Sequence, residues 1–137
     1  MAASESVVSF RVRYSETDQM GTYYNSRPLE WFELGRTDLL RNIGMAYSDM
    51  EKKGVLLPVI EAHLEYRGRA RYDDLLKIIT TATMVGRARI RFDVRILHAD
   101  RDAEIVRGYT IHAFAAPSGK PIRPPAPLLA ALGESSR

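Results

Sequence analysis

One carboxylate, that of Asp18, lies where it could take part in acyl-transfer chemistry. It stands three residues before Gly21, and a strongly helical pattern opens soon afterwards at Pro28. The start of a helix leaves backbone N–H groups unpaired, and its dipole favours negative charge. Such donors can polarise a carbonyl and hold an oxyanion, while a carboxylate opposite activates water or attacks directly. Asp is also a common turn residue, so spacing alone leaves a purely structural role open.

Other catalytic arrangements are absent from the sequence. The chain of 137 residues has no cysteine, which excludes disulfides, a thiol nucleophile and cysteine-ligated metal. It contains no GxSxG elbow, no glycine-rich phosphate loop and no HExxH zinc motif. Its three histidines, His63, His98 and His112, fall on different expected strands, which is typical of structural or exposed histidines. We therefore expect no metal and no resident cofactor.

The composition is that of one globular domain spanning residues 1–137, with loose tails at about 1–6 and 133–137. Apolar residues make up 45% of the chain, which is enough for a core. The chain has 20 Lys and Arg residues and 17 Asp and Glu residues. This mixed charge does not require a nucleic-acid partner. The apolar runs are too short for a membrane span, and the N-terminus lacks the pattern of a secretory signal, so we expect a cytoplasmic protein.

The chain alternates between two periodicities that define its elements. Apolar residues at every second position predict strands, and spacings of three, four and seven predict helices. Pro28 fits the first turn of the long helix, Asn25 or Ser26 can cap it, and Gly44 can end it. The expected strands are 8–14, 55–66, 75–85, 90–96 and 105–114, and the expected helical segments are 28–43, 46–53 and 128–132. Short links between successive strands favour antiparallel pairing, so the fold class is α+β, with one long helix packed on the sheet.

A family resemblance supports a chemical role for Asp18. The segments RYSETDQMG and LEWFELGRTDLLR, within Arg13–Arg41, resemble the opening signature of hot-dog-fold acyl-CoA thioesterases of the 4-hydroxybenzoyl-CoA thioesterase type. The resemblance covers most of the chain in the right order. It continues through Ala70–Ile78, Arg89–Ile96, Gly108–Phe114 and Gly119–Pro125.

The resemblance implies a hot-dog fold, a curved antiparallel sheet of about five strands wrapped around one long helix. It implies homodimers, often paired into tetramers, with the active site between subunits and coenzyme A present only as part of the acyl-CoA substrate. It makes Asp18 the catalytic general base or nucleophile. It also assigns to Tyr24 the backbone N–H that points at the thioester carbonyl.

The chain departs from this family where the long helix begins. The bacterial branch that it resembles most usually has His-Ala-Asn-Tyr at the positions of Asn25, Ser26, Arg27 and Pro28. Asn25 can form hydrogen bonds, but it cannot shuttle a proton near neutral pH. A thiol leaving group with a pKa of about 8.5 can depart as thiolate without a strong general acid, so hydrolysis remains the expectation. Arg27 is either a selector of acidic acyl groups or an exposed first-turn residue.

Coenzyme A carries several phosphate charges, so its site should be cationic. The resemblance places phosphate contacts near Arg87 and Arg89, which with Arg91 would share one strand face, and near Lys120 and Arg123 in a loop. Each of these arginines could equally be an ordinary exposed strand residue. An apolar acyl pocket could include aromatic and methionine side chains that would otherwise belong to the core, namely Met20, Tyr23, Tyr24, Trp31 and Phe32.

Two other functions remain open. The first is a hot-dog domain that binds acyl-CoA or an acyl carrier without hydrolysing it, and Asn25 keeps this alternative open. The second is a nucleic-acid-binding domain that uses the arginines at 67, 69 and 71 and at 87, 89 and 91. Interleaved acidic residues and the lack of an aromatic stacking pattern argue against the second.

Overall fold

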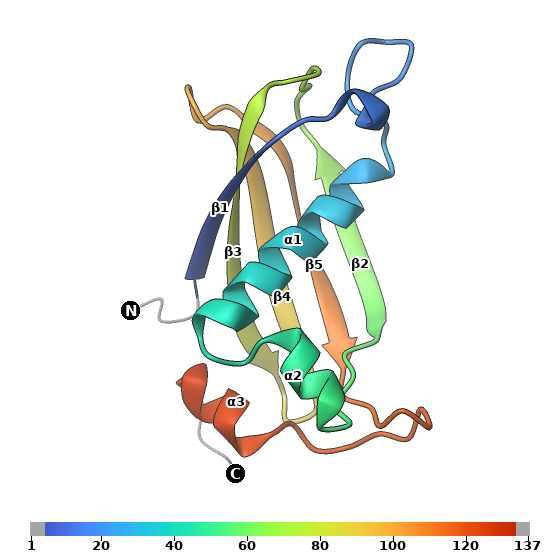
Figure 1. The fold of residues 1–137 in the computed structure, drawn as a ribbon, viewed down its shortest axis with the longest axis vertical. Coiled ribbons are helices and arrows are strands. Elements are labelled where there is room, and N and C mark those ends of the chain that lie inside the picture. Colours follow the sequence, from blue (N-terminus) through green and yellow to red (C-terminus); the bar gives the residue numbers. More distant parts are fainter. Residues whose placement is uncertain (1–4, 134–137) are drawn as a thin grey trace.

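A five-stranded antiparallel sheet carries one long helix across its face (Figure 1). The computed structural model describes residues 5–133. The strand order is β1-β3-β4-β5-β2, so β1 and β2 form the two edges. This is the curved-sheet, single-helix architecture expected from the resemblance. The elements are β1 (Glu5–Arg11), a 3-10 turn (Tyr14–Glu16), α1 (Arg27–Asn42), α2 (Tyr47–Lys52), β2 (Val59–Tyr66), β3 (Leu75–Val85), β4 (Arg89–His98), β5 (Glu104–Ala113) and α3 (Ala126–Ala131).

The helix α1 packs on the sheet through one apolar stripe. Trp31, Phe32 and Leu39 are at most 1% exposed, as helical periodicity predicts for a face turned to a core. The helix approaches β3 closely at Gly35, where a β-carbon would lie 2.2 Å from the Thr80 hydroxyl oxygen. Trp31, Phe32 and Tyr23 are therefore core residues rather than an open acyl lining.

Strands β2 and β5 also approach each other closely. Gly108 pairs with Leu64, and a β-carbon on Gly108 would lie 1.9 Å from the His63 carbonyl oxygen. The pairing is shifted in register between Val59 and Glu61, at the start of β2. This start lies after Pro58, so the residues from 55 to 58 do not form the strand that the sequence indicated. Among them, Leu56 makes an isolated bridge to Ala115.

Several element bounds differ from those expected. Strand β1 begins at Glu5, inside the segment expected to be a loose tail, and ends at Arg11 because the chain turns into the 3-10 segment. Residues 1–4 and 134–137 lie outside the described residues. Ser26 occupies the N-cap position of α1 without a side-chain capping bond. Within residues 5–133, no helix has the length and apolar character needed to cross a membrane.

Candidate active site

Asp18 lies in a tight hairpin between the 3-10 turn and α1. Its N–H donates to the Thr22 carbonyl at 2.9 Å, and the Gly21 N–H donates to the Asp18 carbonyl at 3.0 Å. Gly21 has a φ of 78°, a value that glycine adopts without strain. The Asp18 Oδ1 atom accepts from the Met20 N–H at 2.8 Å. No described residue bonds to the other carboxylate oxygen, so Asp18 both holds the turn and keeps one oxygen free.

A buried glutamate, Glu16, anchors this hairpin to the core. Its side chain is 1% exposed and accepts from the Trp31 indole N–H at 2.8 Å and the Arg13 backbone N–H at 2.7 Å. The Arg13 guanidinium adds an ion pair at 3.1 Å. Burial raises the pKa of Glu16, but the hydrogen bonds from Arg13 and Trp31 outweigh it, so the pKa is lowered overall. The carboxylate therefore stays ionised and ties the hairpin to α1.

The backbone donors at the start of α1 are not all free. The Tyr24 N–H, expected to face the thioester carbonyl, donates to the Glu16 carbonyl at 2.7 Å. The N–H groups of Asn25 and Ser26 have no partner among the described residues. The Asn25 carbonyl accepts from the Tyr66 hydroxyl of β2, which ties the helix start to that edge strand. The first free amide is thus that of Asn25, one residue after Tyr24, the residue that the family resemblance indicated.

The cations expected to bind coenzyme A gather at one end of the sheet. Arg89 begins β4 and lies opposite Ala113, the last residue of β5. The chain beyond β5 turns back at the bridge between Ala115 and Pro121, which places the loop of Lys120 and Arg123 at the same end. All four cations, Arg87, Arg89, Lys120 and Arg123, are exposed.

The expected ladder of Arg87, Arg89 and Arg91 on one strand face is wrong. Arg87 lies in the turn between β3 and β4 rather than on a strand, because β4 begins only at Arg89. Arg91 is committed elsewhere: its guanidinium lies 3.9 Å from the centre of the Tyr109 ring and pairs with Asp93 at 3.0 Å. Of these three arginines, Arg87 and Arg89 remain available for phosphate groups.

Within one chain, the hairpin before α1 and the turn between β3 and β4 lie at opposite ends of the sheet (Figure 1). Arg11, at the end of β1, pairs with Leu75, the first residue of β3, so the Asp18 hairpin follows at that end. The cations lie at the other end of β3, which has 11 residues. At about 3.3 Å per residue, this length separates the two groups by about 33 Å. One chain therefore does not bring its own carboxylate and cations together.

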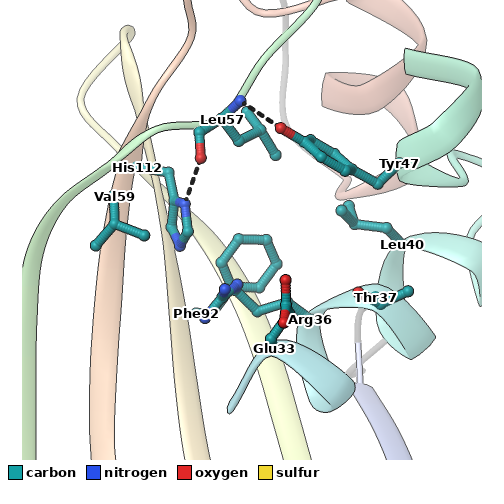
Figure 2. A pocket seen from close by; sticks show the side chains of 9 residues that line it. All are labelled: Glu33, Arg36, Thr37, Leu40, Tyr47, Leu57, Val59, Phe92 and His112. Atoms are coloured by element: carbon teal, nitrogen blue, oxygen red, sulfur yellow. Dashed lines mark hydrogen bonds between the residues drawn. The ribbon is translucent and has the colours of Figure 1, made fainter. Parts of the chain in front are cut away.

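A cavity of about 220 Å³ opens between α1, the starts of β2 and β4 and the end of β5 (Figure 2). Its lining mixes apolar and polar side chains. The residues are Glu33, Arg36, Thr37, Leu40, Tyr47, Leu57, Val59, Phe92 and His112. No sequence pattern predicted this cavity, because its lining comes from five segments that meet only in the folded chain.

His112, expected to be structural or exposed, is 2% exposed on the cavity wall. Its Nδ1 atom lies 2.9 Å from the Leu57 carbonyl oxygen, so Nδ1 carries the proton and donates. Its Nε2 atom then accepts from the Thr110 hydroxyl at 2.9 Å. Burial and the nearby charge of Arg36 lower the pKa to about 4 against the Leu57 bond, so the ring is neutral at pH 7. Residues 5–133 contain no group of three or more His, Asp or Glu side chains that could hold a metal ion.

Sequence comparison relates the chain to known proteins. Residues 12–132 match the thioesterase-like superfamily. YneP of Bacillus subtilis is 48% identical over 69 residues, which is half of each chain. YbgC of Escherichia coli, an acyl-CoA thioester hydrolase, is 31% identical over 90 residues, which cover 66% of this chain and 67% of YbgC.

Structural comparison agrees on the fold. A 1,4-dihydroxy-2-naphthoyl-CoA thioesterase from Synechocystis superposes with a TM-score of 0.87 over 97% of this chain and 98% of that one. Its sequence is 21% identical, so the likeness is one of fold. The expected hot-dog architecture is confirmed by this match.

Proposed function

Because this chain belongs to the thioesterase-like superfamily, we propose that it hydrolyses an acyl-CoA thioester to the free acid and coenzyme A. The observation that carries the proposal is the Asp18 hairpin, which ends at the unpaired amides just before α1. Asp18 has a free carboxylate oxygen, and the Asn25 N–H has no partner among the described residues. A base and an oxyanion donor are the two groups that thioester hydrolysis requires.

The proposed hydrolysis of the thioester needs few protein groups. Asp18 removes a proton from water as the water oxygen bonds to the thioester carbon. Alternatively, the carboxylate attacks that carbon itself, and water then hydrolyses the resulting anhydride to the free acid and restores Asp18. The Asn25 N–H holds the oxyanion, in place of the Tyr24 N–H, which Glu16 already occupies. The carbon–sulfur bond breaks, and coenzyme A leaves as thiolate because its pKa is about 8.5. Asn25 therefore needs to supply no proton.

Non-hydrolytic binding of an acyl-CoA or acyl carrier is the second candidate, because Asn25 replaces the imidazole of similar thioesterases. A thiol-release assay over a panel of CoA esters separates the two functions. Release above the uncatalysed rate supports hydrolysis. Binding of the same esters without thiol release supports the alternative.

We propose a homodimer joined along the edge of β2, which then pairs with a second dimer. Strand β2 is the edge strand beside the helix start, and three of its large apolar side chains are about half exposed: Val59, Ile60 and Tyr66. An unpaired apolar edge is a template for pairing with a second chain. When two β2 strands pair in antiparallel fashion, the end of one sheet that carries Asp18 lies beside the opposite end of the partner's sheet. Asp18 of one chain therefore approaches the cations of its partner.

Size-exclusion chromatography with light scattering tests this interface. Wild-type protein is expected at twice the mass of one chain or a multiple of that. Ile60→Lys is expected to shift the protein to monomer and to lower thioester hydrolysis, because a charge on the edge opposes strand pairing. Val7→Lys on the opposite edge strand, where Val7 is 56% exposed, is the matched control. A wild-type monomer with full activity would rule out the shared site.

The cations at the far end of the sheet give a second test. We expect Arg123→Ala or Arg87→Ala to raise KM for CoA esters about threefold to tenfold, since each removes one phosphate contact. KM for a short thioester without the nucleotide should not change. Arg101→Ala, in the exposed turn after β4, is the control. Equal effects on both kinds of substrate would contradict a role in binding coenzyme A.

A further inference from the structure

The cavity beside α1 contains a half-buried cation, Arg36, whose Nη1 atom is buried without a hydrogen-bond partner. The Arg36 side chain makes no hydrogen bond or ion pair with any described residue, and its Nη1 atom is inaccessible to solvent. Burial lowers the pKa of Arg36 against the opposing charge of Glu33, yet guanidinium stays protonated in proteins. A buried charge that lacks partners costs free energy. A ligand that accepts hydrogen bonds from the Arg36 guanidinium would offset this cost.

The other polar groups on the wall are engaged to different degrees. The two nitrogens of His112 are taken by Leu57 and Thr110. The Tyr47 oxygen accepts from the Leu57 N–H at 3.2 Å, which leaves its own O–H as a donor. The donors left for a ligand are therefore the Arg36 guanidinium and the hydroxyls of Thr37 and Tyr47. Leu40 and Phe92 contribute apolar wall (Figure 2). The cavity suits a group that combines apolar surface with a hydrogen-bond-accepting oxygen.

The volume also limits what can enter. A water molecule takes about 30 Å³ of liquid volume, so a cavity of about 220 Å³ equals about seven waters. That space holds the end of an acyl group and not a whole coenzyme A ester. Arg36 is a cation on α1, whereas the exposed cations proposed to bind the nucleotide lie at the start of β4 and on the turn and loop beside it.

The cavity lies close to the start of β2, and Asn25 is tied to the end of that strand. Val59 lines the cavity, whereas Tyr66 bonds to the Asn25 carbonyl. Seven residues at about 3.3 Å place these two points about 23 Å apart in one chain. In the proposed antiparallel pairing of β2 edges, the end of one strand faces the start of the other. The thioester held at one subunit can thus extend its acyl group into the cavity of its partner.

We propose that this cavity binds the far end of the acyl group and that Arg36 selects an acyl group ending in a hydrogen-bond-accepting oxygen, a carboxylate or a hydroxyl. The inference rests on the proposed thioester hydrolysis and names the substrate class of that site. Arg36 touches the non-reacting end of the substrate, so it determines specificity. Glu33, which is exposed at the rim, can accept a hydrogen bond from a terminal hydroxyl.

The test compares three CoA esters that share eight carbons and differ at the far end: octanoyl, 8-hydroxyoctanoyl and octanedioyl. Wild-type kcat/KM is expected to be at least about tenfold higher for an oxygen-terminated ester, the factor that one hydrogen bond to a charged group provides. Arg36→Met is expected to reduce that ratio to near one while retaining octanoyl turnover. Arg36→Lys should keep part of the preference for the carboxylate. Arg41→Met, at an exposed position of the same helix, should leave the ratio unchanged.

A binding measurement separates this inference from the proposed function. Octanedioate is expected to raise the Tm of wild-type protein more than octanoate does, and Arg36→Met should abolish that difference. Arg36→Met should fold, because methionine of similar length replaces a half-buried charge that has no hydrogen-bond partner. If no ester is hydrolysed but octanedioate still stabilises through Arg36, hydrolysis fails and the cavity assignment holds. If all three esters turn over equally in wild-type protein, or the preference survives in Arg36→Met, the cavity assignment is overturned and hydrolysis stands.

Discussion

Asp18→Asn is expected to lower kcat for acyl-CoA hydrolysis by about a hundredfold or more, because an amide can neither accept the proton of water nor attack the thioester. The fold should survive, since the asparagine Oδ1 atom can still accept from the Met20 N–H as the aspartate does at 2.8 Å. Thiol release measures the first effect, and thermal unfolding measures the second. The variant separates the two roles of Asp18, because it removes the chemistry and keeps the turn.

Asp100→Asn is the matched control, since Asp100 lies in an exposed turn with a side chain 76% exposed. Its activity should equal that of wild type. Undiminished turnover in Asp18→Asn would remove Asp18 from the mechanism. A large fall in Tm together with lost activity would instead make Asp18 a structural residue, the alternative that spacing in the sequence left open.

Glu16→Gln is expected to lower the free energy of unfolding by about 2–4 kcal/mol, because charged hydrogen bonds in a buried site are lost. The glutamate receives three donors, one from Trp31 and two from Arg13. A glutamine turns an N–H₂ group toward one of them and leaves that donor unpaired. Chemical denaturation measures the loss. Catalysis should fall as well, because Glu16 holds the hairpin that carries Asp18.

The pH dependence of the unfolding free energy tests whether the ionised Glu16 carboxylate causes this stabilisation. The pKa of Glu16 is lower in the folded chain than its usual value of 4.5, so ionised Glu16 stabilises the fold above about pH 4.5. That contribution is lost as the pH falls through the folded pKa. The stability gap between wild type and Glu16→Gln should therefore be constant near neutrality and narrow in acid. Glu30→Gln, an exposed change on α1, should show almost no gap, and an equal gap there would exclude a special role for Glu16.

Local patterns predicted most of the fold. Alternation and helical spacing located the long helix and the later strands, because these periodicities decide which face of each element becomes buried. Pro28 and Gly44 marked the limits of α1, since proline fits a first turn and Gly44 adopts a φ of 81°. The start of β1 and the conformation of residues 55–58 were predicted less well. Both depend on pairing with strands distant in the sequence.

The candidate site was predicted only in part. The motif around Asp18 pointed to the family, and the match over residues 12–132 confirms that membership. Its chemical role remains a proposal. The motif could not show that the Tyr24 N–H is occupied by the Glu16 carbonyl, because that bond closes a hairpin whose geometry is not a property of the residue types.

The sequence alone therefore determined the fold class, the family and the position of a carboxylate before a helix, since each is written in local spacing and residue type. The tertiary structure decided which groups are free to act. It paired Tyr24, freed the Asn25 amide, moved Arg87 into a turn and left Arg36 unpartnered on a cavity wall. These outcomes depend on contacts between residues far apart in the chain, and hydrogen bonds and burial exist only once those residues meet.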